Sequence, residues 1–404
     1  MNQSHRSSYR HALSRRGVLT LAAALALRSP FVMAGQTDVA DDLPPFADRI
    51  GMLLAMAPAR ELTDDPLISF YHADLARQMA SVGVELPDSN AAPDSLPDGF
   101  VESSLALPLA ARAFQAGMTP EWFETFGFNP FGVDQALALN DPPDILTIFT
   151  GDFDVDQIES VLDASGYRRF EQEIGGSYWT VGDELDLGSQ VGQLGFGTMN
   201  HAAVYKDVLV FAQREADVQE LTHVVAGNVA PMLEQERWAG MIALFSPDTV
   251  GLIPVSPEIA GAGDGSAVVG ASTLVPGTSS GLEYMAFGVR AGSVSEPLSL
   301  VGQGTPEAAP VSGSSSVPAQ VEVRIRYADA AMSGREAEAI PERWRELSSP
   351  LTGQPYAELM RLDNSRAHED DDSVVAVDFV SDVPNRWIQM VQTRDLAPFL
   401  PVVG

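Results

Sequence analysis

The sequence predicts an α+β fold made of two halves, each a split β-α-β unit of the ferredoxin-like kind, with an antiparallel sheet and its helices on one face. Three observations predict this fold. The apolar run 145–149 indicates a buried strand, and a helix with one apolar stripe follows it. The order strand, helix, strand, strand, helix then recurs near the C-terminus. Between the halves, residues 291–319 are dominated by Gly, Ser, Pro and Thr, which is typical of a linker or a long exposed loop.

Two α+β domains are therefore expected, one over residues 67–290 and one over residues 320–404. Apolar spacing and turn residues predict the elements that precede the core of the first domain. These are a helix over 46–56, a strand over 67–71, a helix over 74–81, a loop over 85–99 rich in Pro, Asp, Ser and Asn, and a short helix that Thr119 caps and Pro120 begins.

The core of the first domain begins with the strand at 145–149. Asp154, followed three residues later by Gln157, has the form of a capping box, and Gly166 stands where a helix C-cap is expected. The pattern then predicts strands over 167–174, 177–181 and 203–212 and an amphipathic helix over 217–226.

The second domain begins with strict alternation of apolar and charged residues over 321–327, the pattern of a half-buried strand. Pro341 and Pro384 each precede an Arg-Trp pair, and proline favours the first turn of a helix. We therefore expect helices over 341–347 and from about Pro384, with strands over 356–362 and 374–380 between them.

Composition excludes several kinds of chemistry. The 404 residues include no cysteine, so disulfides, thiolate nucleophiles, iron–sulfur clusters and cysteine-ligated zinc are all excluded. The net charge of −31 predicts a surface that repels nucleic acid and anionic lipid and attracts cations or basic partners. No sequence motif for a cofactor or a phosphate group is present, and no cofactor is expected.

The N-terminus has the order of a secretory signal. Arg15 and Arg16 precede an apolar run over 17–27, and a small-residue cleavage site ends at Ala34. The paired arginines resemble a bacterial twin-arginine export leader. This resemblance implies a leader over 1–34 and a mature protein that is periplasmic, extracellular or associated with the cell surface, with membrane contact only during export. Residues 35–66 form an N-terminal segment that is expected to be partly disordered.

Gly277–Gly281 matches G-x-S-x-G, which makes Ser279 a candidate nucleophile with His368 as its base. A nucleophile elbow needs a strand before the serine and a helix after it. Here Pro276 precedes the motif and strand-like sequence follows it, so a turn is favoured.

The acidic segment 368–372 is the candidate cation site, since closely spaced carboxylates repel one another until a cation neutralises them. Its residues are His368, Glu369, Asp370, Asp371 and Asp372. A solvated hairpin tip is the alternative, and the sequence favours it. No histidine spacing suits zinc, and no metal site is otherwise expected.

Aromatic residues raise one further alternative. The five tryptophans either pack in the core or line a ligand groove, and tryptophans on amphipathic helices are usually core residues. The aromatic segment 123–131 is either a packed loop or a mobile lip over a pocket. The leading hypothesis is an exported, non-catalytic binding or cell-surface protein whose partner is a small molecule, a cation or an envelope protein. The alternatives are a secreted hydrolase that uses carboxylates or Ser279, and a structural envelope component.

Overall fold

The computed structural model describes most of the expected domains and none of the leader. Its described ranges are 43–59, 70–93, 96–141, 144–171, 177–183, 186–255, 281–294 and 317–400. The export signal at Arg15, Arg16 and Ala34, the candidate nucleophile Ser279 and most of the expected linker 291–319 lie outside these ranges.

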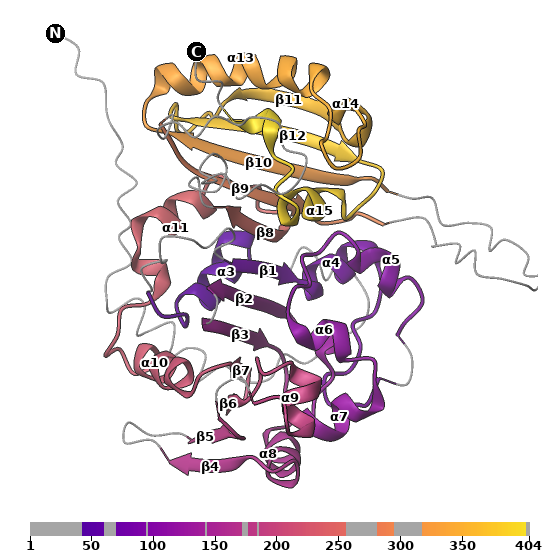
Figure 1. Cartoon of the computed structure of the whole chain (residues 1–404), viewed down its shortest axis with the longest axis vertical. Helices are drawn as coiled ribbons and strands as arrows, with labels where there is room; N and C mark the ends of the chain where they lie inside the picture. Colours follow the sequence, from indigo (N-terminus) through magenta and orange to yellow (C-terminus); the bar gives the residue numbers. More distant parts are fainter. Residues whose placement is uncertain are drawn as a thin grey trace, which may run out of the picture.

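The described strands form a 12-stranded sheet in which all neighbours are antiparallel (Figure 1). In chain order they are β1 (Phe70–Asp74), β2 (Gln135–Asp141), β3 (Asp144–Thr150), β4 (Arg168–Glu171), β5 (Ser177–Thr180), β6 (His201–Tyr205), β7 (Val208–Ala212), β8 (Thr249–Val255), β9 (Leu282–Arg290), β10 (Ala319–Tyr327), β11 (Arg361–Ala367) and β12 (Val374–Ser381). Their order across the sheet is β11-β12-β10-β9-β8-β1-β2-β3-β7-β6-β5-β4.

Helices flank this sheet. They are α3 (Phe46–Leu54), α4 (Leu75–Val82), α5 (Phe100–Ser104), α6 (Arg112–Ala116), α7 (Pro120–Phe126), α8 (Val155–Ala164), α9 (Gln190–Gly195), α10 (Glu215–Val225), α11 (Glu236–Ile242), α13 (Ala330–Glu346), α14 (Tyr356–Leu359) and α15 (Arg386–Gln392). Short 3-10 helices are η1 (Pro130–Gly132), η2 (Met232–Glu234) and η3 (Ala397–Phe399). None of the helices in the described ranges combines the length and the apolarity needed to cross a bilayer.

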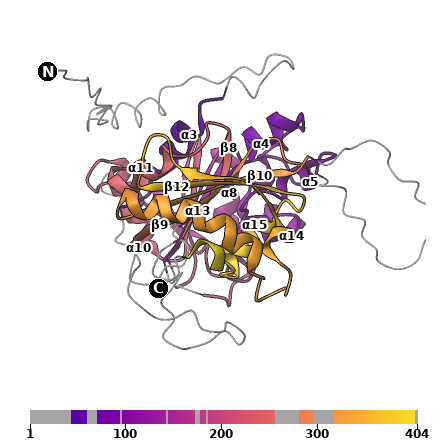
Figure 2. The same cartoon turned by 90° about the horizontal axis from the view of Figure 1, so that it is seen from above.

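The α+β class is confirmed, but the two halves share one sheet. Strand β9 of the first half pairs with β10 of the second half, so backbone hydrogen bonds run continuously between the halves. In the C-terminal half the order β10-β12-β11 is that of a split β-α-β unit, and α13 and α15 lie on the same side of it (Figure 2).

The first half differs from the expected unit. The hairpin of β4 and β5 follows α8 and forms the outer edge of the sheet beyond β6 and β7. Ile158 of α8 belongs to the hydrophobic cluster on one face, whereas Val218 and Leu221 of α10 belong to the cluster on the other face. The expectation of helices on one face is therefore wrong for this half.

Three expected elements are also corrected. Residues 203–212 form a hairpin, because Lys206 and Asp207 make a turn between the buried strands β6 and β7. Residues 356–362 begin as the helix α14 rather than as a strand. Pro341 lies inside α13, which begins eleven residues earlier where the side chain of Asp329 accepts a hydrogen bond from the N–H of Met332.

Two charged residues of β10, Glu322 and Arg324, are buried, contrary to the half-buried strand that alternation predicts. The carboxylate of Glu322 accepts hydrogen bonds from Thr249 Oγ1 at 2.9 Å and from Arg324 Nη2 at 2.8 Å. Arg324 in turn lies 5.5 Å from the ring centroid of Phe245. Each buried charge thus has a partner of opposite sign, which offsets its loss of hydration.

All five tryptophans are buried, so the core reading holds for them. They are Trp122, Trp179, Trp238, Trp344 and Trp387. Within the aromatic segment, Phe126 packs edge-on against Phe211 of β7, with ring centroids 5.9 Å apart. Phe128 stacks on the same ring, with centroids 5.7 Å apart. This segment is therefore a packed loop against the sheet.

Candidate functional site

His368 lies in the turn between β11 and β12, and both of its ring nitrogens have backbone partners. Nε2 is 3.2 Å from the carbonyl oxygen of Leu244, and Nδ1 accepts a hydrogen bond from the N–H of Asp370 at 3.2 Å. A general base needs a free ring nitrogen next to its nucleophile. The contacts of this imidazole instead hold the turn against the segment that precedes β8.

The acidic residues of this turn diverge. Asp371 faces Arg326 at 3.0 Å and accepts from the hydroxyl of Ser373 at 2.6 Å. Partial burial disfavours its charge, but the hydrogen bonds from Ser373 and the nearby Arg326 hold the pKa of Asp371 below its usual value.

The other three acids, Glu369, Asp370 and Asp372, are exposed. Nowhere in the described ranges do three or more His, Asp or Glu side chains gather closely enough to hold a metal ion.

A buried ionic cluster that the sequence did not indicate lies where β1 ends. The guanidinium of Arg49, from α3, donates to both carboxylate oxygens of Asp74, from Nε at 2.5 Å and from Nη2 at 2.7 Å. Asp74 also caps α4 by accepting from the N–H of Arg77 at 3.0 Å. Both partners of this pair are almost fully buried. The pair therefore ties α3 to the sheet.

Two titratable neighbours of this pair have strongly shifted pKa values. Burial lowers the pKa of His72 to about 4, so its ring is neutral beneath Phe46. Burial raises the pKa of Asp134 to about 6, and the nearby carboxylates of Asp74, Asp152 and Asp207 add to that rise against the effect of Arg49. Perturbed groups of this kind often mark functional sites. His72 is completely enclosed, so no ligand reaches it.

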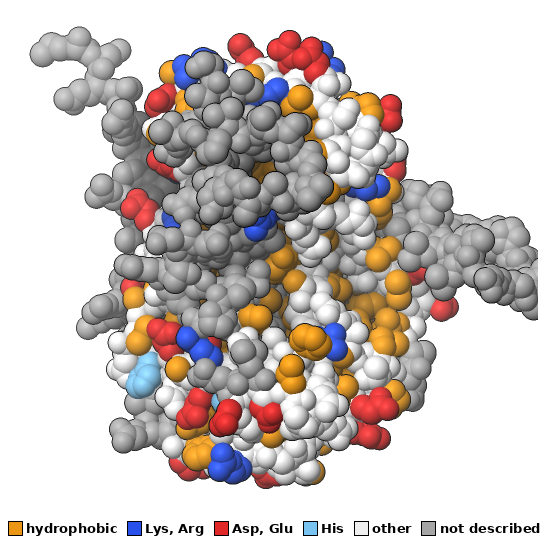
Figure 3. Space-filling model, in the orientation of Figure 1, with side chains coloured by type: hydrophobic (Ala, Val, Ile, Leu, Met, Phe, Trp, Pro, Cys, Tyr) orange, Lys and Arg blue, Asp and Glu red, His pale blue; other side chains and the backbone are white. Residues whose placement is uncertain are grey.

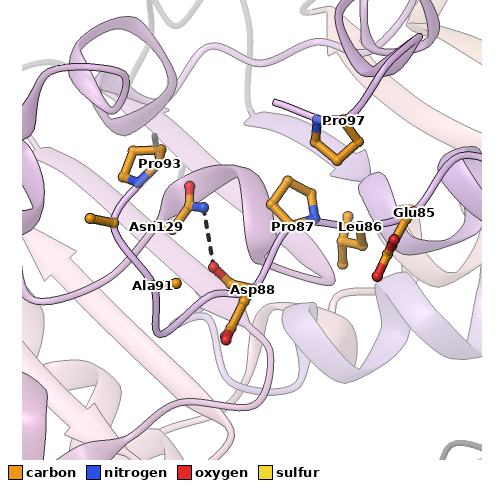
Figure 4. A pocket seen from close by; sticks show the side chains of 9 residues that line it. Glu85, Leu86, Pro87, Asp88, Ala91, Pro93, Pro97 and Asn129 are labelled. Carbon is orange, nitrogen blue, oxygen red and sulfur yellow. Dashed lines mark hydrogen bonds between the residues drawn. The ribbon is translucent and has the colours of Figure 1, made fainter. Parts of the chain in front are cut away.

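An accessible candidate is a hollow bordered by the loop that follows α4 (Figure 4). Its volume is about 250 Å³. Proline, leucine and alanine side chains form most of its wall, and Glu85 and Asp88 add two carboxylates. The described lining residues are Glu85, Leu86, Pro87, Asp88, Ala91, Ala92, Pro93, Pro97 and Asn129.

Hydrogen bonds to the α7–η1 and β3–α8 turns hold this loop in place. Asn129 donates from Nδ2 to the carbonyl of Asp88 at 3.1 Å and caps η1 with its side-chain oxygen. Ser89 and Asn90 both donate to the carbonyl of Asp152, at 2.6 and 2.8 Å. The wall of the hollow is thus fixed before any ligand arrives.

Gln157 belongs to the same network, and its role differs from the one that the sequence predicts. Asp154 caps α8 as expected, since it accepts from the N–H of Gln157 at 3.0 Å. The side chain of Gln157 donates instead to the carbonyls of Asn90 and Gly127, at 3.2 and 3.0 Å. The reciprocal half of the capping box is therefore replaced by two bonds to the loops around the hollow.

One glycine allows the loop to approach this closely. A Cβ on Gly132 would lie 2.5 Å from the carbonyl oxygen of Pro87 and 2.5 Å from the N of Ser89. Those backbone atoms belong to the wall, so any larger residue would push it outward. The sequence indicated a Pro-rich loop at 85–99, but the side-chain hydrogen bonds that order it join residues between 41 and 67 positions apart.

Comparison with known proteins adds little to this geometry. No family model and no curated protein matches the sequence. A solved structure described as "Structure of crystal form I of TP0453" is similar with a TM-score of 0.37 and 8% sequence identity, over 83% of this chain and 99% of that chain. A similarity at this level says nothing about function.

Proposed function

We propose that this chain is an exported, non-catalytic binding protein that takes a small cationic ligand with a short apolar body in the hollow between the α4–α5 loop and Asn129. The observation that carries the proposal is the preformed wall, which combines apolar proline and leucine side chains with two carboxylates. The proposal of export depends on the resemblance of residues 1–34 to a twin-arginine leader.

Charge favours a cation over other ligands. Glu85 and Asp88 are the charged groups among the described lining residues, and no arginine, lysine or histidine stands beside them there. The net charge of −31 increases the local concentration of cations around the whole molecule.

The volume limits the ligand to a small one. Drug-sized ligands occupy pockets of roughly 300–1,000 Å³, and this hollow is smaller at about 250 Å³. The walls suit a few methylene groups, with an amine directed at the carboxylates. A short diamine or a small quaternary amine has these properties.

Binding without chemistry is favoured by the kinds of residue in the wall. The described lining residues include no serine, histidine, lysine or tyrosine. The amide of Asn129 is already used, because its nitrogen donates to Asp88 and its oxygen accepts from Phe131. The carboxylates that remain are suited to holding a positive charge.

The experiment measures the melting temperature of the mature protein with 1,4-diaminobutane or choline, at constant ionic strength. A ligand at ten times its Kd raises the unfolding free energy by about 1.4 kcal/mol, which corresponds to about 3 °C. The neutral analogue 1,4-butanediol and the anion succinate are expected to cause no shift.

The double variant Glu85→Gln/Asp88→Asn is expected to lose the shift. A matched control, Asp98→Asn/Asp363→Asn, removes two exposed acids that do not line the hollow and is expected to keep it. Equal loss of the shift in both double variants, or no shift with either amine, would count against the hollow as a cation site.

A further inference from the structure

Phe196 is the most exposed large apolar side chain among the described residues, at 63%. It ends α9 with a φ of 55°, in the left-handed region that a bulky side chain rarely adopts. Gly195 and Gly197 stand on either side of it, yet the strained position itself carries an aromatic ring. Strain of this kind persists where the surroundings impose it, and it gathers at functional surfaces.

Arg112 holds this ring in its outward position. Its guanidinium lies 5.4 Å from the centroid of the Phe196 ring, and its Nε donates to the carbonyl of Leu194 at 2.9 Å. A further hydrogen bond, from Arg112 Nη1 to Gln115 Oε1 at 3.1 Å, fixes the orientation of the guanidinium group. The ring is thus supported from the side of α6 and presented to solvent.

The surroundings of this ring are apolar with an acidic border. Helix α9 packs against α6 and α7, and Met118, in the turn between those two helices, is 44% exposed. Glu121 and Glu124 on α7 are exposed beside it. Figure 3 shows hydrophobic side chains gathered on this side of the molecule, with acidic side chains further down the same face.

We propose that the Phe196 patch, made of Arg112, Met118 and Phe196 with Glu121 and Glu124 at its border, docks a basic amphipathic segment of a partner protein. The aromatic ring and Met118 would contact the apolar face of that segment, and the two glutamates would pair with its Lys or Arg side chains. None of these residues lines the hollow, so this proposal is independent of the proposed function.

Charge complementarity selects this partner over two others. An anionic bilayer would be repelled by the acidic border and by the net charge of −31. A second copy of the chain would meet the same repulsion, since it carries the same charge. A basic segment is instead attracted by both the acidic border and the negative net charge.

The test uses two synthetic 14-residue helical peptides, one of leucine and lysine and one of leucine and glutamate, titrated into the mature protein by calorimetry. We expect the lysine peptide to bind, with an affinity that falls as salt is raised, and the glutamate peptide not to bind. Phe196→Gly is expected to weaken binding at least tenfold without any change in charge. This variant is also expected to keep or raise the melting temperature, because glycine adopts this φ without strain.

Control variants separate the patch from general electrostatic attraction. Leu351→Ser removes another exposed apolar side chain, on the C-terminal half, and is expected to leave peptide binding unchanged. Glu121→Gln/Glu124→Gln is expected to weaken binding and to reduce its salt dependence.

Four results would overturn the proposal. These are unchanged lysine-peptide binding in Phe196→Gly, equal binding of both peptides, Phe196-dependent binding to anionic vesicles, and a concentration-dependent dimer in sedimentation that Phe196→Gly abolishes.

Discussion

The hydroxyl of Ser365, on β11, donates to the carbonyl oxygen of Ala337, on α13, at 2.8 Å. This carbonyl lies four residues before Pro341, which has no N–H to offer it. A strand side chain therefore satisfies the acceptor that an interior proline leaves free. The same contact joins the helix to the edge of the sheet.

Ser365→Ala is expected to lower the free energy of unfolding by about 1 kcal/mol, because a partly buried carbonyl loses its donor. In a Pro341→Ala background the cost is expected to fall by about half or more, since the new alanine N–H can bond to Ala337. A double-mutant cycle from urea unfolding measures the difference. The same cost in both backgrounds would mean that Ser365 does not compensate for the proline.

Arg49→Met leaves the carboxylate of Asp74 buried without its counter-charge. We expect a loss of about 3–5 kcal/mol in urea unfolding. Adding Asp74→Asn is expected to recover part of this loss, because asparagine carries no charge and still caps α4. As a matched control, Arg169→Met breaks the exposed pair with Glu159 and should cost less than about 1 kcal/mol. Equal losses for the two arginines would rule out a special role for the buried pair.

Asp134→Asn is expected to stabilise the protein at neutral pH. The folded pKa of Asp134 is about 6, above the ordinary value of 3.8, so the folded state binds the proton more tightly than the unfolded state. Its contribution to stability is therefore present at low pH and lost as pH rises from about 4 to about 6. The variant should gain about 2–3 kcal/mol at pH 7 and little at pH 4. A gain independent of pH would argue against titration of this carboxyl.

His72 is expected to act in the opposite direction over the same pH range. Its folded pKa is about 4, below the ordinary value of 6.5, so the unfolded state binds the proton more tightly. Stability is therefore lost as pH falls from 6.5 towards 4. His72→Gln should show a smaller fall in unfolding free energy between pH 7 and pH 4.5, whatever its absolute stability. If the unfolding free energy of His72→Gln, measured by chemical denaturation, fell with pH as steeply as that of the unchanged protein, His72 would be excluded as the source of this pH dependence.

Gly132→Ala is expected to displace the wall of the hollow, because the new Cβ would lie 2.5 Å from backbone atoms of Pro87 and Ser89. We expect a loss of about 2 kcal/mol in stability and the loss of the amine-induced rise in melting temperature. Gly334→Ala is the matched control, since its Cβ meets nothing within 4 Å on α13. That control should gain up to about 1 kcal/mol from higher helix propensity. A Gly132→Ala protein that still responded to amines would show that the wall tolerates the shift.

Local pattern predicted most of the regular elements. The run 145–149 lies inside β3, and Asp154 and Gly166 stand at the ends of α8, where Gly166 has a φ of 91°. These predictions succeed because a cap or an apolar stripe depends on residues a few positions apart. The prediction of one strand over 203–212 is wrong because the charged pair Lys206 and Asp207, which interrupts the apolar pattern, forms a two-residue turn between β6 and β7.

The sequence pattern could not predict the candidate site. The acidic turn at 368–372 is visible in sequence, but the directions of its side chains depend on Arg326 and Leu244, which come from other strands and loops. The hollow is built by contacts of loop 85–93 with Asn129, Asp152 and Gln157. Such partners have no sequence signature, since chain folding alone brings them together.

Composition and local pattern predicted the α+β class, the absence of thiol chemistry, the large negative net charge and the N-cap of α8 at Asp154. Three features became visible in the tertiary structure alone: the pairing of β9 with β10 that joins the two halves in one sheet, the buried pair of Arg49 and Asp74, and the outward position of Phe196. The reason is the sequence separation of the residues that interact. Helix and strand propensities arise from neighbours in the chain, whereas strand pairing, burial of charge and surface shape depend on which distant segments come into contact.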